Sequence, residues 1–203
     1  MKTIIELYII LIITFFCNSA FSGELTADSI YFDRGNEYYN SEEYDKAIED
    51  YDRIISLYPD FTKAYFNRGL AYYKKEQYDK AVADYSKVIT AFPKETEAYA
   101  ERGLSYLKNQ KYSEAIDDFS KVISLDPKFM QAYTNRGIAY AKAGRYDEAI
   151  ADYNRIIDKN PDDVNAIVSR GIAYAKKAMV DFKKACEMGN KNACEDYKQI
   201  KGK

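Results

Sequence analysis

The dipeptide Arg-Gly recurs along the chain at a constant spacing of 34 residues. It occurs five times, beginning at Arg34, Arg68, Arg102, Arg136 and Arg170. A proline keeps the same spacing in the first four copies, from Pro59 to Pro161. A fixed period of this size is typical of a solenoid, in which each repeat is one supersecondary unit stacked on its neighbours. The period therefore predicts a binding array rather than a catalytic pocket.

The period divides the chain into four full units and a degenerate fifth. The units are 28–61, 62–95, 96–129 and 130–163, and the fifth begins at Val164. In each unit position 4 holds an aromatic or apolar residue, position 8 holds Gly and position 11 holds Tyr. These three positions lie on one face of an α-helix. A second stripe, such as Ala47, Tyr51 and Ile54, follows after turn-forming residues. Each unit is predicted to be a pair of amphipathic helices, and the proline ends the second one.

These positions resemble the tetratricopeptide repeat (TPR) family. The second unit has the family residues at positions 4, 8, 11, 20, 24 and 32, namely Tyr65, Gly69, Tyr72, Ala81, Tyr85 and Pro93. The resemblance covers residues 28 to about 163 and implies an all-α, right-handed α-solenoid of stacked helix-turn-helix units. Small residues at positions 8 and 20 would let the two helices approach closely, with aromatic rings filling the space around them. An Arg at position 7, where the family often has Leu, departs from the pattern.

Each of the first four Arg residues is matched by an acidic residue in the second helix of the same unit. The partners are Asp50, Asp84, Asp118 and Asp152. We interpret the pairs as structural ion pairs between the helices, with a ligand role for the Arg residues as the alternative. A half-buried pair matters because removing one partner leaves the other charge stranded.

The N-terminus predicts export. Lys2 precedes an apolar run that ends at Cys17, which is too short for a comfortable transmembrane helix. Small residues at Ala20 and Ser22 suit cleavage after Ser22, so 1–22 is predicted to be a signal peptide and 23–27 a short linker. The protein would then be periplasmic or secreted. An uncleaved anchor and a lipoprotein attached at Cys17 are the alternatives.

The fifth unit is shortened. Nine steps separate Tyr140 from Ala149 in the fourth unit, whereas only four separate Tyr174 from Ala178 in the fifth. The inter-helix turn is therefore missing, and we expect one long helix from about Asn165 to Met188. A tight turn at Lys176-Lys177 is the alternative. An uncovered apolar stripe on such a helix would favour self-association, so a homodimer through this end is a hypothesis.

Two cysteines, Cys186 and Cys194, lie near the C-terminus of the exported chain. The segment resembles the cysteine-rich Sel-like relatives of the TPR class, in which a C-x7-C pair bridges two adjacent helices. The resemblance implies a disulfide in a capping segment within 164–203. In one continuous helix the two residues would lie about 12 Å apart, so a break at Gly189-Asn190 is needed.

The first helix of each unit lines the concave groove in this family. The residues at its groove positions are predicted to contact a peptide or partner segment: Phe32, Asn36, Tyr39, Phe66, Asn67, Leu70, Tyr73, Lys74, Glu97, Glu101, Leu104, Lys108, Asn135 and Lys142. The N-terminal half is aromatic and the middle is acidic. Packing between units is the alternative role for the aromatic residues, and complementing helix dipoles is the alternative role for the lysines.

The family's carboxylate clamp for chaperone C-termini is incomplete. Asn36 and Asn67 match it, but Phe32, Glu97 and Glu101 stand where the clamp has cations. A ligand anchored by its terminal carboxylate is therefore not expected.

Composition and motifs favour a non-catalytic scaffold of the bacterial cell envelope. The 30 basic and 32 acidic residues leave no positive excess for nucleic acid, and the chain has no His. It has neither a phosphate-binding Gly loop nor a nucleophile elbow, and two thiolates alone do not complete a zinc site. No metal or cofactor is expected. A homo-oligomer assembly module is the alternative function, and an exported Sel-like enzyme is a remote one.

Overall fold

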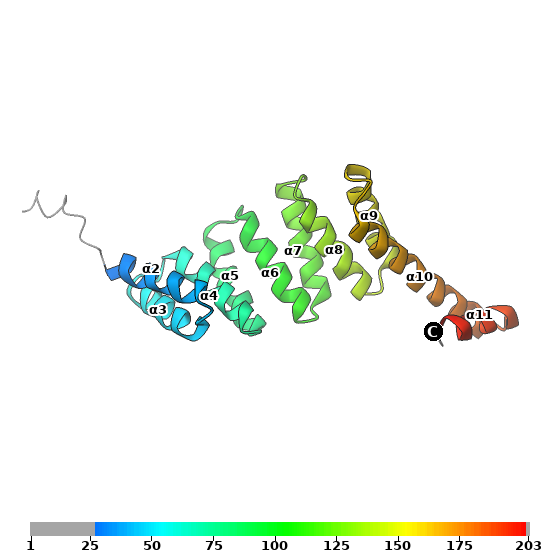
Figure 1. Ribbon diagram of the computed structural model, residues 1–203, viewed down its shortest axis with the longest axis horizontal. Coiled ribbons are helices and arrows are strands. Elements are labelled where there is room, and N and C mark those ends of the chain that lie inside the picture. The colour runs from blue at the N-terminus through cyan, green and yellow to red at the C-terminus, as the bar shows by residue number, and fades with distance from the viewer. Residues whose placement is uncertain (1–26, 202–203) are drawn as a thin grey trace, which may run out of the picture.

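The computed structural model describes residues 27–201, in which ten helices joined by short turns form antiparallel pairs (Figure 1). The predicted signal peptide 1–22 and its cleavage site lie outside the described residues. The helices are α2 (Ala27–Asn40), α3 (Tyr44–Leu57), α4 (Thr62–Lys74), α5 (Tyr78–Ala91), α6 (Thr96–Lys108), α7 (Tyr112–Leu125), α8 (Met130–Lys142), α9 (Tyr146–Lys159), α10 (Val164–Glu187) and α11 (Lys191–Lys201).

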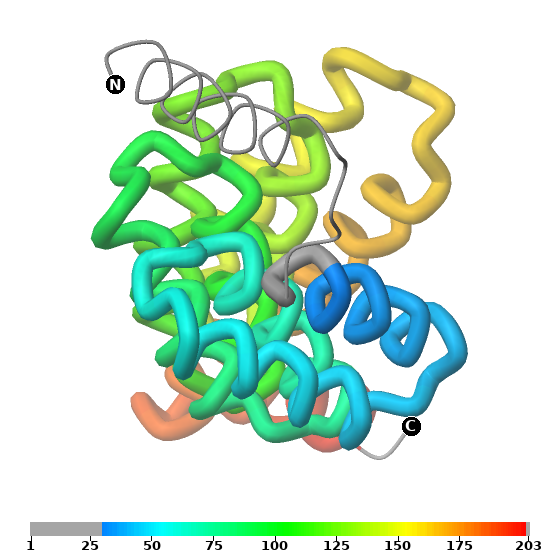
Figure 2. Tube along the Cα trace, turned by 90° about the vertical axis from the view of Figure 1, so that its left-hand side faces the viewer, coloured from blue at the N-terminus to red at the C-terminus, as the bar shows by residue number. Residues whose placement is uncertain are grey.

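Each helix packs chiefly against the helix before it and the helix after it, so the array is elongated and its two ends lie far apart. Viewed along the array in Figure 2, successive pairs are rotated relative to one another. The predicted all-α solenoid of helix-turn-helix units is confirmed.

A glycine and an aromatic ring hold the two helices of each full unit together. An added Cβ at Gly35, Gly69, Gly103 or Gly137 would lie only 2.8–2.9 Å from a ring carbon of the aromatic residue at position 24. Those rings belong to Tyr51, Tyr85, Phe119 and Tyr153, and all four are buried. The glycine is therefore required by close approach of the ring, as the sequence pattern predicted.

The predicted Arg–Asp pairs form in all four full units. In the third, the Nε and Nη2 atoms of Arg102 donate to the two carboxylate oxygens of Asp118 at 2.8 and 2.7 Å. The guanidinium also lies 5.5 and 5.8 Å from the ring centroids of Tyr99 and Tyr106. The hydrogen bonds to Asp118 raise the pKa of Arg102, whereas burial raises the pKa of Asp118. For Asp118, the free-energy cost of burying the charge therefore exceeds the stabilisation that the guanidinium of Arg102 provides.

The same Arg residues also join each unit to the one before it. The remaining Nη1 atom of Arg68, Arg102, Arg136 and Arg170 donates to position 25 of the preceding unit, which is Asp52, Ser86, Ser120 and Asn154 respectively. This second bond was not predicted. A guanidinium can make both because it presents five donors in a fixed plane.

A residue with positive φ ends the first helix of each full unit. These residues are Glu42, Glu76, Gln110 and Gly144, with φ between 58° and 77°. A left-handed residue at this place satisfies the last carbonyls of a helix and reverses the chain.

The fifth unit has no such residue at the equivalent place, and α10 runs without a break for 24 residues. The predicted long helix is confirmed, and the alternative tight turn at Lys176-Lys177 is wrong. Gly171, which is equivalent to the four close-packed glycines, meets nothing within 4 Å.

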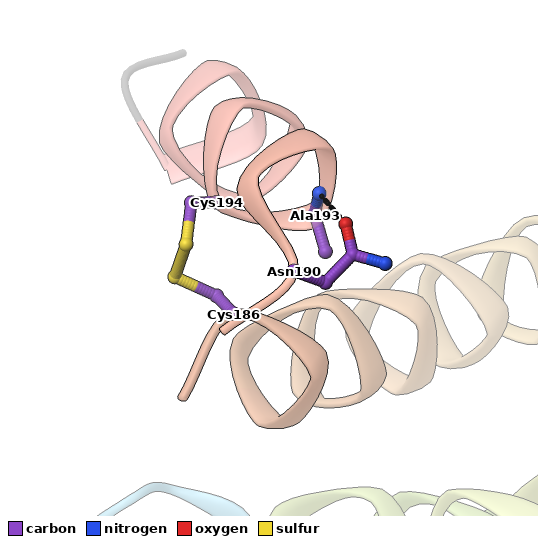
Figure 3. Close-up of a disulfide and its surroundings, with 4 residues drawn as sticks. All are labelled: Cys186, Asn190, Ala193 and Cys194. Carbon is purple, nitrogen blue, oxygen red and sulfur yellow. Dashed lines mark hydrogen bonds between the residues drawn. A yellow bond between two sulfur atoms is a disulfide. The ribbon is translucent and has the colours of Figure 1, made fainter. Parts of the chain in front are cut away.

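A disulfide joins the last two helices (Figure 3). Gly189 has a φ of +93° and ends α10, and the side chain of Asn190 accepts a hydrogen bond from the backbone N–H of Ala193 at the start of α11. This turn brings the Cα atoms of Cys186 and Cys194 to 4.6 Å. The predicted disulfide is present in the structure, while the Sel-like resemblance of this segment remains a prediction.

Replacing Gly103 and Gly171 by Ala should have opposite effects. Gly103→Ala places a Cβ against the buried Phe119 ring, and we expect a loss of about 1–2 kcal/mol after the gain in helix propensity is subtracted. Gly171→Ala, in open space, should stabilise the helix by about 0.5–1 kcal/mol. Urea unfolding at low protein concentration measures both. Equal effects would contradict the role assigned to the ring.

Replacing Asp118 by Asn should destabilise the solenoid by about 2 kcal/mol, because the mostly buried Arg102 loses its counter-charge. The neighbouring Asp117 is exposed and makes no ion pair in the described residues, so Asp117→Asn is the matched control and should change stability by less than about 0.5 kcal/mol. A similar urea midpoint for both variants would show that the pair has little structural role.

Replacing Cys186 and Cys194 by Ser should release α11 while leaving α2–α9 intact. The bridge closes a short loop, so its loss should weaken docking of α11 by roughly 2–3 kcal/mol. Hydrogen exchange should accelerate in 191–201, and reduction of the unmodified protein should have the same effect. Unchanged exchange there would mean that packing alone holds the helix.

Candidate functional site

The main candidate site is an open cavity of about 420 Å³ in the N-terminal half of the array. It is lined by residues of α2 and α4 and by residues at the end of α5 and the start of α6. Four of its lining residues were predicted as groove residues, namely Phe32, Phe66, Asn67 and Glu97. Five others were not, namely Thr62, Lys63, Val88, Phe92 and Glu95.

Aromatic rings form the apolar wall of the cavity. Phe32 packs edge-on against Phe61 with a centroid distance of 5.2 Å, and Phe66 packs on Tyr85 at 5.6 Å. Both phenylalanines are half-buried, whereas Phe92 is 53% exposed. The first two rings thus have the packing role that was the alternative interpretation and still line the cavity, while Phe92 is the more exposed ring and is available to a ligand.

The two asparagines that match the clamp are bonded to each other. The amide of Asn67 donates to the side-chain oxygen of Asn36 at 2.7 Å, and the same oxygen accepts from the Tyr51 hydroxyl at 2.8 Å. This network links two units and fixes the orientation of both amides.

The second unit lacks the corresponding bond. Leu70 occupies the position of Asn36 and cannot accept a hydrogen bond, so the buried hydroxyl of Tyr85 has no partner among residues 27–201. Burial raises the pKa of Tyr85, which keeps this hydroxyl neutral. In the third unit the residue equivalent to Tyr85 is Phe119, which has no hydroxyl and needs no hydrogen-bond partner.

Two glutamates on α6 make the neighbouring part of the groove acidic. Glu97 lines the cavity and is exposed, and Glu101 lies one turn further along the helix and is half-buried. Burial raises the pKa of Glu101, the charge of Glu97 adds to the effect, and Lys74 opposes it. Glu95 and Glu97 outnumber Lys63 among the charged residues of the cavity lining, so the groove combines an apolar wall with an excess of negative charge. This combination suits a ligand that carries both an apolar side chain and a cation.

Several of the other predicted groove residues pack against residues of the array. Tyr39 and Tyr73 pack on Tyr44 and Tyr78, the first residues of the second helices. Leu104 packs against the core around Phe119, and Asn135 is buried and accepts a hydrogen bond from Gln131. Leu104 and Asn135 thus serve packing within the array.

The three lysines predicted to line the groove are exposed. Lys74, Lys108 and Lys142 each lie in the last turn of a first helix, where a cation complements the helix dipole. In the part of the chain that the structure describes, none of the three makes an ion pair. Ion pairs between units are made by neighbouring lysines instead, as between Lys111 and Asp79 at 2.8 Å.

Sequence reasoning missed Phe92 and Val88 because they come from the end of a second helix, whereas the groove positions were taken from first helices. The available signal was the apolar residue at position 31, present as Tyr58 and Phe92 in the first two units and replaced by Asp126 in the third.

Over residues 27–201, no group of three or more His, Cys, Asp and Glu side chains is arranged to hold a metal ion. None of the helices described is both long enough and apolar enough to cross a membrane.

Comparison with known structures supports the same architecture. The crystal structure of MamA is 23% identical, with a TM-score of 0.71 over 87% of this chain and 92% of MamA. YrrB, described as a TPR protein with an unusual peptide-binding site, is 21% identical, with a TM-score of 0.64 over 84% of each chain. At these identities the likeness shows the fold alone.

A third similar structure is the second TPR domain of the human RPAP3 protein in complex with the HSP70 peptide SGPTIEEVD. It is 29% identical, with a TM-score of 0.52 over 54% of this chain and 92% of that domain. No functionally curated protein matches the sequence. The family model described as Tetratricopeptide repeat matches residues 32–96 and 101–164, which together are more than half of the sequence. The chain belongs to the tetratricopeptide repeat family.

Proposed function

We propose that this protein is a non-catalytic interaction scaffold of the bacterial cell envelope that binds a segment of a partner protein in its N-terminal groove. The observation that carries the proposal is the open cavity whose most exposed ring, Phe92, adjoins Glu95 and Glu97. A large exposed ring in a concave site suits an anchoring contact with a peptide. TPR proteins are interaction modules, and the RPAP3 domain was solved with a peptide bound.

The ligand should be basic and apolar rather than acidic. The HSP70 peptide of the RPAP3 complex ends in Glu-Glu-Val-Asp. At three places where the carboxylate clamp has cations, this chain presents Phe32, Glu97 and Glu101. An acidic peptide would meet like charge there, whereas a Lys or Arg next to an apolar anchor would be attracted.

Export is supported by the N-terminal pattern and by the disulfide between Cys186 and Cys194. Structural disulfides persist in oxidising compartments such as the periplasm. A periplasmic or secreted protein that carries this groove would bind envelope proteins or exported segments.

Selection from a displayed peptide library tests the ligand class. We expect enriched peptides to combine an aromatic or large aliphatic residue with Lys or Arg. Phe92→Ala should weaken their binding about tenfold, because the exposed ring is an anchor that the fold needs little. Tyr58→Ala, which changes the equivalent exposed position one unit earlier and outside the cavity, should leave affinity unchanged.

The pH dependence gives a second readout of the same binding. The raised pKa of Glu101 means that its charge, and the attraction for a cation, is lost at a higher pH than for an ordinary glutamate. Affinity should therefore fall on mild acidification in the native protein and less so in Glu101→Gln. Enrichment of acidic peptides, or equal binding by Phe92→Ala, would contradict the proposal.

A further inference from the structure

The first half of α10 exposes a face that is buried or half-buried on the first helix of every full unit. Ile167 is 41% exposed, whereas Tyr133 at the same position of the fourth unit is 8% exposed. Val168, Ile172 and Tyr174 are also about half exposed. Only the side facing α9, with Ala166 and Ala173, is buried. This half of α10 is therefore a first helix without its second helix.

The second half of α10 carries the residue pattern of the missing second helix. Four of its residues repeat the spacing and type of the residues with which α9 covers α8. They are Ala178, Asp181, Phe182 and Ala185, which correspond to Ala149, Asp152, Tyr153 and Ile156. The Asp that pairs with Arg and the ring that packs on Gly are thus both present in the fifth unit.

Within one chain these two halves cannot meet. Arg170 and Asp181, and likewise Gly171 and Phe182, are eleven residues apart in one straight helix, which places them about 16 Å from each other. Arg170 accordingly keeps its bond to Asn154 of the preceding unit but forms no ion pair within the part of the chain that the structure describes. Among the described residues, Asp181 makes no ion pair or hydrogen bond to another side chain.

The second half of α10 instead borders an open groove. Its lining includes Ala178, Asp181, Phe182 and Ala185, and the other wall is formed by α11 through residues such as Ala193. The segment extends beyond α9, as Figure 1 shows, and α11 packs on it as the first helix of a sixth unit would. If the second half of α10 is taken as the second helix of the fifth unit, the open groove beside it is where the first helix of that unit would pack.

The cause of this separation is the loss of five residues. The fourth unit has Ala143-Gly144-Arg145-Tyr146-Asp147 between Lys142 and Glu148, whereas Lys176 and Lys177 are adjacent in the fifth. The lost segment includes the left-handed turn residue Gly144. When a hinge is too short to fold back, two copies of a chain can exchange the elements that it connects.

We propose that a second copy of this chain completes the fifth unit by reciprocal exchange. The two α10 helices would lie antiparallel about a two-fold axis near Lys176 and Lys177. Phe182 of each subunit would pack on the partner subunit's Gly171, and Arg170 of each would pair with the partner subunit's Asp181. Both contacts repeat those inside the full units, and both occur twice because the arrangement is symmetric.

The second copy is the occupant that the residues specify. Any apolar helix could cover Ile167 and Val168, but the second half of α10 also carries an aromatic ring and an Asp at the spacing that Gly171 and Arg170 need. The second half of α10 also lacks a first helix to pack on, and the reciprocal arrangement gives each half of α10 a packing partner.

Charge exchange between two variants tests the pairing. The native protein should show a dimer mass by light scattering over a range of concentrations. Arg170→Asp and Asp181→Arg, each alone, should be largely monomeric, because each homodimer would oppose like charges twice. Their mixture should form a heterodimer, since both contacts are restored between unlike subunits. A native protein that stays monomeric at high concentration, or a mixture that forms no heterodimer, would overturn the proposal.

A second variant tests the glycine contact without disturbing the fold. A Cβ added at Gly171 meets nothing within 4 Å in the single chain, so Gly171→Leu should keep its helicity and lose the dimer. Lys184→Leu adds a similar side chain at an exposed position on the other side of α10 and should keep the dimer. Dimerisation of Gly171→Leu as strong as that of the native protein would contradict the geometry.

Discussion

The contact between a glycine on one helix and an aromatic ring on the next determines most of this structure. An added Cβ at any of the four glycines would lie within 3 Å of the ring, so the helices of a unit are as close as their side chains permit. This closeness places the Arg of one helix beside the Asp of the other. It also makes each first helix dependent on a partner helix, which the fifth unit does not supply within its own chain.

The Arg at position 7 explains how the array replaces the Leu that is common in the family. In the fourth unit the guanidinium of Arg136 lies between the rings of Tyr133 and Tyr140, binds Asp152 with two hydrogen bonds and reaches Ser120 of the unit before. A polar residue can occupy this half-buried position because most of its donors are satisfied. One side chain thus joins two helices within a unit and two units to each other.

The sequence predicted the features that depend on spacing. The helix pairs, the Arg–Asp pairs and the long helix α10 follow from periods and from lost turn residues, whereas the disulfide between Cys186 and Cys194 was expected from a resemblance to Sel-like proteins. The groove was predicted less well, because a residue's exposure depends on what the next unit places against it. Leu104 and Asn135 have groove positions but are half-buried and buried, whereas Phe92, which follows the end of α5, is exposed and lines the cavity.

The central claim is that each first helix requires a second helix with the Asp and the ring, and that the fifth unit lacks one only because five residues are missing. Insertion of Ala-Gly-Arg-Tyr-Asp between Lys176 and Lys177 should restore the turn of the fourth unit. The account predicts that light scattering will find a monomer for the inserted chain and a dimer for the native one. The same mass for both chains would contradict it.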